Sequence, residues 1–359
     1  MFKQIQTMKK GTWFILMLIG LTGLTAVILY IMLFGQIEPS YKEFRTRNMD
    51  YQLWNADHDP TTIETYYLLE PERMVLEPFR GYDQFLRSLT YDKKKYKTQT
   101  DSFYFYTYAA DRIIGIFDLA ALGEIHLTDY HLEIDSIMGF ICKYASIKDK
   151  KAAWPMHFKF MKYGMDYGWF SGHTQGRMLS AIARVYEHNG DMTVYDLGTK
   201  AVDFCFTSIE NGGFCNYISD RECCFEEYPM APASSVLNGH IICMLGLYDF
   251  YRVTSYQPAF DLFEKGMEYL RNNLKTYDLG YWSRYDALYS YSASYFYHKM
   301  IHIPQLRVLY AITHEPFLDN YASKWEENMR NPDFCVFKLK ALIDAIDRRF
   351  VYKSWFNIG

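Results

Sequence analysis

The chain has 359 residues, a formal net charge of −4 and an aromatic content of 18%, with 33 tyrosines. The slight negative charge provides no general attraction to nucleic acid, so we expect no nucleic-acid partner. The length suffices for one large domain of roughly 200–300 residues with additional segments. Tyrosine combines an apolar ring with a polar hydroxyl, which suits sugar-binding clefts as well as packed cores.

The seven cysteines do not form a recognisable metal or disulfide pattern. There is no CxxC pair and no Cys/His spacing typical of zinc ligands, and the odd count does not fit a disulfide framework. No glycine-rich dinucleotide fingerprint follows a strand pattern, which argues against a redox-type sugar-nucleotide epimerase. We therefore expect neither a metal nor a cofactor.

Near the N-terminus, residues 12–34 form an uncharged apolar run that is long enough to cross a bilayer. Trp13 and Tyr30 lie near its ends, as interfacial aromatics often do. No small-residue cleavage site follows, which favours a retained anchor over a signal peptide. We expect an N-terminal tail at 1–11, a single-pass transmembrane anchor at 12–34, and a proline-containing linker at 35–100.

The remainder of the chain, residues 101–350, is dominated by helical periodicity. Apolar side chains recur at close to 3.6-residue spacing over 178–186, 237–248 and 260–274. Further helices are expected at 103–122, 127–145, 193–208, 299–313, 315–330 and 335–349. Glycine-containing breaks separate several of these segments, and little alternating strand pattern is present. The pattern predicts an all-α body of helical hairpins, whose connecting loops are where sites usually form.

Two groups of proton-transfer side chains stand out in this body. The first is Glu226-Glu227-Tyr228-Pro229, with Asn238 at the start of the following apolar run. The second is Tyr297-His298 with His302. Paired carboxylates beside phenols and imidazoles are suited to acid–base chemistry. From the residues alone, Glu227 also fits an interaction with a helix N-terminus, Asn238 a helix cap, and the histidines a hydrogen-bonded core.

Four segments together resemble the C-terminal domain of the D-glucuronyl C5-epimerases, the family of the heparan sulfate epimerase. They are WPMHFKFMKYGMDYGWFSGHTQGRMLSAIARVY (154–186), EEYPMAPASSVLNGHIICMLGLYDFY (226–251), WSRYDAL (282–288) and FYHKMIHIPQLRVLY (296–310). The resemblance covers roughly residues 120–332. It implies an (α/α) toroid, that is, a barrel of helical hairpins, and inversion at C5 of a glucuronate residue within a uronic-acid-containing polysaccharide. It also implies a homodimer and an extracytoplasmic body on the periplasmic or lumenal side.

The resemblance also assigns roles to individual residues. Glu227 matches the catalytic carboxylate and Tyr297 the tyrosine that serves the opposite face of the sugar. Tyr228 and Tyr285 match further active-site tyrosines, and Asn238 a substrate-binding asparagine. Candidates for the remaining substrate contacts are Arg284, His298, His302, Trp169 and His173. For Trp169, core packing is an equally good interpretation.

One departure from the family concerns substrate binding. The vertebrate enzymes have an arginine three residues after the tyrosine that Tyr285 matches, expected to hold the uronate carboxylate, and here that position is Leu288. Arg284 is the candidate replacement. Two alternatives to an epimerase therefore stay open: a uronate polysaccharide lyase that uses the same proton abstraction, and a non-catalytic glycan-binding or assembly protein.

Overall fold

The computed structural model describes residues 90–92, 102–104, 106–121, 123, 125–160, 163–289, 292–293 and 297–330. All of them belong to the second of the two units of the chain, Asp59–Gly359. The expected tail, the transmembrane run at 12–34, most of the linker and the helix at 335–349 lie outside the described residues. No described helix is long and apolar enough to cross a bilayer.

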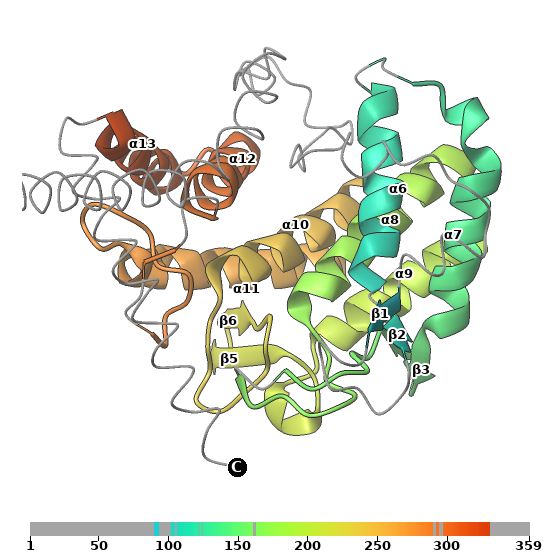
Figure 1. Ribbon diagram of the computed structural model, residues 1–359, viewed down its shortest axis with the longest axis horizontal. Coiled ribbons are helices and arrows are strands. Elements are labelled where there is room, and N and C mark those ends of the chain that lie inside the picture. Colours follow the sequence, from blue (N-terminus) through green and yellow to red (C-terminus); the bar gives the residue numbers. More distant parts are fainter. Residues whose placement is uncertain are drawn as a thin grey trace, which may run out of the picture. The chain divides into compact units, whose positions relative to one another are not determined.

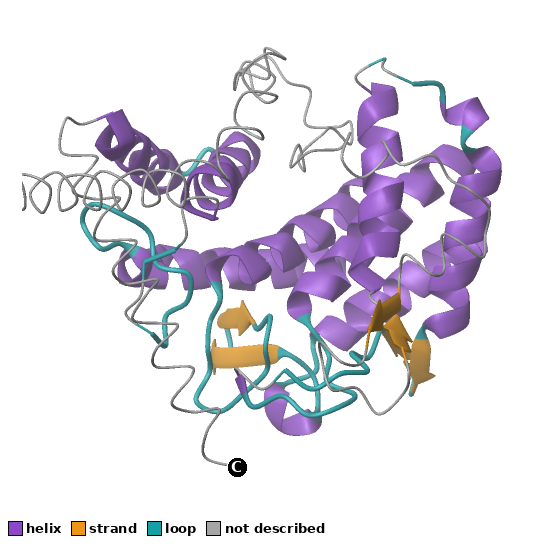
Figure 2. Cartoon of the chain, viewed as in Figure 1, coloured by secondary structure: helices purple, strands orange, loops and turns teal. Residues whose placement is uncertain are grey.

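The predicted helices within the described residues are confirmed, and Figure 2 shows that helices dominate this part of the chain. The α-helices are α6 (Tyr106–Ala121), α7 (His131–Tyr144), α8 (Gly172–Asn189), α9 (Met192–Cys205), α10 (Leu237–Thr254), α11 (Gln257–Asn273), α12 (Ile303–Thr313) and α13 (Pro316–Arg330). A π-helical turn, η6 (Tyr297–His302), leads into α12. Short 3-10 turns are η2 (Leu127–Asp129), η4 (Ile209–Asn211) and η5 (Leu274–Tyr277). The all-α class is therefore confirmed.

Consecutive helices pack as hairpins: α6 with α7, α8 with α9, α10 with α11, and α12 with α13. The first helices of the hairpins also contact one another, α6 against α8 and α8 against α10 (Figure 1). Gly176 of α8 and Gly246 of α10 allow the closest approach, because a Cβ on Gly246 would lie 2.1 Å from the Gly176 carbonyl oxygen. This arrangement fits an array of hairpins, and closure of the array into a toroid stays a prediction.

The first turns of these helices lie close to one another. The Thr107 and Thr174 hydroxyls, in the first turns of α6 and α8, are 3.1 Å apart. Gln305, near the start of α12, donates its side-chain amide to the Asn238 carbonyl oxygen in the first turn of α10, at 3.5 Å. The loops before α8, α10 and α12 therefore approach one another.

A buried ion network joins the three helices further along their length. The Arg184 guanidinium lies 3.2 Å from Asp118 of α6 and 3.0 Å from Asp249 of α10, and Ser180 donates to Asp249 at 2.7 Å. Burial raises the pKa values of Asp118 and Asp249, while the Arg184 charge lowers them. Because every partner is deeply buried, removing one of them would leave an uncompensated charge.

Three short antiparallel strand pairs lie in the loops: β1 (Thr90–Asp92) with β2 (Ser102–Tyr104), β3 (Ser146–Lys148) with β4 (Lys151–Ala153), and β5 (Cys215–Ser219) with β6 (Glu222–Phe225). None of them was predicted from the sequence, and β1 falls within the expected linker. The β5–β6 hairpin matters most for function, because the loop with Glu226 and Glu227, residues 226–236, begins directly after it, and we refer to it as the acidic loop.

Candidate active site

Glu226 is the first residue of the loop that follows β6, and its side chain bonds residues near the end of that loop. This side chain has no exposed surface. Its carboxylate accepts hydrogen bonds from the Ser235 backbone nitrogen at 2.7 Å, the Ser235 hydroxyl at 2.9 Å and the Ser234 hydroxyl at 3.0 Å. Burial raises the pKa of Glu226, and these hydrogen bonds oppose the rise. Glu226 thus ties the start of the loop to its end, just before α10.

Glu227 points the other way, against the first turn of α10, and is half-buried. The Asn238 side-chain amide donates to Glu227 Oε2 at 3.4 Å. A Cβ built on Gly239 would lie 2.6 Å from Glu227 Cβ and 2.7 Å from Oε2. The carboxylate therefore lies at a helix N-terminus, where the partial positive charge of the helix dipole stabilises an anion.

Three tyrosines gather around this carboxylate, and we refer to Glu227, Tyr228, Tyr285 and Tyr297 as the Glu227 cluster. The Tyr285 and Tyr297 rings meet edge to face with centroids 4.9 Å apart. Burial raises the pKa of Tyr228, and the charge and hydrogen bond of Glu227 raise it further. A hydrogen bond with Tyr285 lowers the pKa values of Tyr228 and Tyr297 and partly offsets these increases.

The same causes act on the other two phenols. Burial, then the Glu227 charge, raises the pKa of Tyr285 well above its usual range and that of Tyr297 to about 12. All three phenols are consequently neutral near pH 7, and each carries a proton that it can donate. The structure thus groups one carboxylate with three protonated hydroxyls, drawn from two loops and η6.

Trp169 packs behind this cluster. It is buried, and its indole nitrogen donates to the Phe158 carbonyl oxygen at 3.0 Å. Together with Phe158 and Tyr163 it belongs to an aromatic core that supports Tyr228, whose ring stacks on Tyr163 with centroids 4.3 Å apart. Trp169 thus contacts the site through Tyr228, with its ring centroid at 5.8 Å from that of Tyr228.

His298 and His302 lie on η6 with Tyr297, and the His302 ring centroid is 6.2 Å from that of Tyr297. Both are fully buried and contact the Ser283 hydroxyl, at 2.9 Å and 2.8 Å. Burial lowers the pKa of each to about 3. At neutral pH they are uncharged, and both are hydrogen-bonded to Ser283.

His173 and Arg284 complete the predicted set. His173 lies in the first turn of α8, and burial, with the Arg177 charge, lowers its pKa to about 3. The Arg284 backbone nitrogen donates to the Tyr277 carbonyl oxygen at 2.8 Å, and its side-chain Nε has no hydrogen-bond partner among the residues that the structure describes. Neither side chain forms a hydrogen bond or an ion pair with the Glu227 cluster in the described part of the chain.

Sequence reasoning missed several residues that shape the site. Gly239 makes room for Glu227, and a glycine inside an apolar helical run is a signal of close approach that could have identified it. Asp286 accepts from the Tyr163 hydroxyl at 3.1 Å and from the Tyr289 backbone at 2.7 Å. Ser283 joins the two histidines. No local pattern distinguishes Asp286 or Ser283, because Tyr163 and the two histidines lie 123, 15 and 19 residues away from them in the sequence.

We expect Gly239→Ala to lower activity by about 10- to 100-fold, because the added methyl overlaps the Glu227 side chain and moves it. The measurement is the turnover rate of the site reaction at saturating substrate. Gly139→Ala is the matched control, since Gly139 is an exposed position in α7 with no atom within 4 Å of an added Cβ. This control should keep full activity and gain up to about 1 kcal/mol of stability. Full activity in Gly239→Ala would contradict the placement of Glu227.

We expect the buried histidines to make the fold sensitive to acid. Because His302 has a folded pKa of about 3 and an unfolded pKa near 6.5, the unfolded state binds more protons between these values. Its contribution to the free energy of unfolding is present above pH 6.5. It falls by about 1.4 kcal/mol per pH unit as the pH drops towards 3.

Urea unfolding between pH 7.5 and 4.5 measures how the free energy of unfolding depends on pH. His302→Gln should reduce the slope of that dependence by about 1.4 kcal/mol per pH unit. The buried carboxyls Asp118 and Asp249 act in the opposite direction, so the difference between parent and variant is the informative quantity. His126→Gln is the exposed control and should leave the slope unchanged. Equal slopes for the parent and His302→Gln would refute the assignment.

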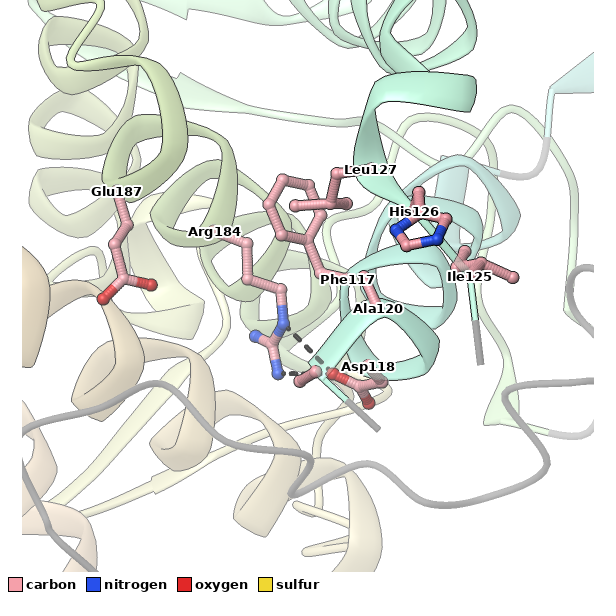
Figure 3. Close-up of a pocket in the computed structure, with 9 residues that line it drawn as sticks. Phe117, Asp118, Ala120, Ile125, His126, Leu127, Arg184 and Glu187 are labelled. Carbon is pink, nitrogen blue, oxygen red and sulfur yellow. Dashed lines mark hydrogen bonds and ion pairs between the residues drawn. The ribbon is translucent and has the colours of Figure 1, made fainter. Parts of the chain in front are cut away.

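A separate pocket of about 370 Å³ lies beside the buried ion network and is lined by residues including Phe117, Asp118 and Arg184 (Figure 3). The Glu226 backbone carbonyl oxygen accepts from the nitrogen of Gly172, the first residue of α8, whereas Arg184 is three turns further along that helix. The pocket is therefore at the opposite end of α8 from the Glu227 cluster. Among the described residues, no group of three or more histidine, cysteine or carboxylate side chains is placed to hold a metal ion.

Comparison with known proteins places the chain beside a family and two relatives. Residues 148–327, half of the chain, match the family model for the D-glucuronyl C5-epimerase C-terminus. An uncharacterized protein of Methanocaldococcus jannaschii is 29% identical over 177 residues, 48% of this chain and 57% of that protein. The D-glucuronyl C5-epimerase of Caenorhabditis elegans is 27% identical over 176 residues, 44% of this chain and 28% of that enzyme.

The matches thus cover little more than half of one relative and just over a quarter of the other. The family model spans β4, the acidic loop, α10, Tyr285 and Tyr297, so every residue of the Glu227 cluster lies inside it. On the strength of this match, the chain belongs to the D-glucuronyl C5-epimerase C-terminus family.

Proposed function

We propose that this protein is a membrane-anchored uronate C5-epimerase that inverts C5 of D-glucuronate residues within a polysaccharide. The observation that carries the proposal is the Glu227 cluster, one carboxylate among three neutral phenols, inside the segment that matches the family. The apolar run at 12–34 supports the anchor, with the body on the extracytoplasmic side.

The chemistry required is a proton transfer at a very weakly acidic carbon, because C5 is α to a carboxylate. Glu227 accepts the C5 proton, and the electron pair of the broken C–H bond moves into the carboxylate to form an enediolate. Tyr228 and Tyr285 donate hydrogen bonds to that developing charge. Tyr297 then donates its proton to C5 from the opposite face, and solvent restores the protonation of both groups.

The protonation states support these assignments. A phenol with a pKa of about 12 remains protonated near neutral pH, so Tyr297 is suited to act as an acid in this direction. Asn238 and the α10 N-terminus stabilise the anionic form of Glu227, which is the form that accepts a proton. With Leu288 at the position of the family arginine, Arg284 is the proposed partner of the uronate carboxylate. We also propose that the protein acts as a homodimer.

Solvent exchange at C5 tests the proposal. The chain is incubated in heavy water with a panel of glucuronate-containing polysaccharides, and NMR locates the deuterium. We expect deuterium at C5 together with the second epimer, without chain cleavage. An unsaturated, ultraviolet-absorbing product would identify a lyase instead, and binding of polymer without any exchange would identify a glycan-binding protein.

A further inference from the structure

Ser283 lies between the two buried histidines of η6 and has no exposed surface. Its hydroxyl oxygen is 2.9 Å from His298 Nδ1 and 2.8 Å from His302 Nδ1. Its backbone nitrogen donates to His298 Nδ1 at 3.1 Å. One small side chain on a loop thus contacts the first and last parts of the π-helical turn.

The positions of the protons follow from these contacts. His298 Nδ1 accepts from the Ser283 backbone N–H, so this nitrogen has no proton and His298 is protonated at Nε2. Two acceptors would repel each other at 2.9 Å, so the Ser283 hydroxyl also donates to His298. The hydroxyl oxygen is then the acceptor for His302, which must have its proton on Nδ1. The two histidines are therefore opposite tautomers.

Aromatic packing and backbone hydrogen bonds hold this arrangement in place. The Trp282 ring stacks on His298 with centroids 4.0 Å apart and planes at 14°. The Trp282 indole donates to the Ala293 carbonyl oxygen at 2.8 Å, and the Ala293 nitrogen donates to the Ser283 carbonyl oxygen at 2.7 Å. Trp325 of α13 packs within 5.8 Å of the His298 ring centroid. The loop and η6 are thus joined by one continuous buried contact.

The two segments joined by this contact each carry a tyrosine of the Glu227 cluster. Tyr285 comes two residues after Ser283 on the loop, and Tyr297 comes directly before His298 on η6. Their rings meet edge to face at 4.9 Å. A π-helical turn inside a helix is often a functional feature, and here it carries Tyr297 and both histidines within six residues, with the His302 ring centroid 6.2 Å from that of Tyr297.

We propose that Ser283 is a positioning residue that fixes Tyr285 and Tyr297 relative to each other by bonding His298 and His302. This role rests on the proposed function, since it concerns the two tyrosines of the same reaction. Ser283 has no contact with a reacting atom in this scheme. It acts by keeping the acid on η6 at a fixed distance from the phenol on the loop.

The kinetic test is Ser283→Ala in the full chain. We expect kcat for C5 inversion to fall about 10- to 100-fold while KM changes less than about threefold, because reacting groups are misplaced and substrate binding is kept. Ser180→Ala is the matched control. It removes another fully buried serine hydroxyl, bonded to Asp249 at 2.7 Å in the ion network, and should keep the parent kcat. A folded Ser283→Ala protein with the parent kcat overturns the proposal.

A second variant and a spectroscopic measurement cover the case in which Ser283→Ala does not fold. Ser283→Cys keeps nearly the same volume with a weaker donor, and we expect about a three- to tenfold fall in kcat. Histidine ¹⁵N NMR of the unsubstituted chain at pH 7 should show His298 protonated at Nε2 and His302 at Nδ1. The same tautomer for both, or a charged ring, overturns the arrangement.

The two possible failures are distinguishable. An unsubstituted chain that never exchanges C5 hydrogen overturns the proposed function. An active chain whose Ser283 variants keep the parent kcat overturns only the positioning role.

Discussion

Glu227→Gln is expected to reduce exchange at C5 by about 10³-fold or more, because it removes the proposed base without changing the shape of the side chain. The glutamine amide oxygen can still accept from Asn238, so the loop should keep its conformation. The loss is therefore expected in kcat, with polymer binding close to that of the parent. The measurement is deuterium incorporation at C5 by NMR under single-turnover and steady-state conditions.

The adjacent carboxylate provides the sharpest control. Glu226→Gln keeps the volume but exchanges one acceptor oxygen for an amide group facing the donors Ser234 and Ser235. We expect it to cost about 1–3 kcal/mol of stability while the folded fraction keeps its exchange rate. Glu210→Gln, at an exposed position, should change neither quantity. Exchange lost in Glu226→Gln and kept in Glu227→Gln would reverse the assignment of the two carboxylates.

The helices of this chain could be predicted because their signal is local. The stripe over 260–274 repeats at helical spacing, and α11 at Gln257–Asn273 buries that face. Likewise, the apolar run from Leu237 forms α10, a largely buried helix beside the site. The β5–β6 hairpin has no comparable signal, since its strands are only five and four residues long.

The family resemblance, and not periodicity, directed attention to Glu227, Tyr228, Tyr285 and Tyr297. Their proximity depends on a loop at Glu227 that meets a second loop and a π-helical turn more than 50 residues further along the chain. Secondary-structure propensities do not predict contacts between such distant segments. The sequence also does not show which of Glu226 and Glu227 faces the site. Only the fold shows that Glu226 turns inward to Ser235, whereas Glu227 turns to Asn238.

His298 and His302 are residues whose type suggested a role that their burial does not favour. His298 and His302 are the residue types most often used for proton transfer near neutral pH, and sequence reasoning accordingly placed them among the substrate contacts. Burial instead lowers the pKa of each to about 3, and Ser283 occupies the Nδ1 atom of both. Burial is a tertiary property, so the sequence alone could not separate a reactive histidine from a bonded core histidine.

Tyr297→Phe is expected to lower the rate of inversion by about 10²- to 10⁴-fold, because the acid that serves the opposite face is removed. In this variant, exchange of the C5 hydrogen with solvent should respond differently from inversion at C5. An epimer whose C5 hydrogen faces Glu227 can still lose that proton and regain a deuteron on the same face. The other epimer, whose hydrogen faces residue 297, should neither exchange nor invert. NMR of both epimers in heavy water measures all four rates in one set of experiments.

This asymmetry separates Tyr297 from the neighbouring phenols. Tyr228→Phe and Tyr285→Phe remove hydrogen bonds to the developing enediolate, which is common to both directions, so exchange and inversion should fall together. Tyr310→Phe, on α12 beside His314, changes a tyrosine outside the Glu227 cluster and should keep every rate. Equal losses of exchange and inversion in Tyr297→Phe, for both epimers, would place Tyr297 with the enediolate donors. The acid would then have to be sought at another residue that faces the same side of the ring.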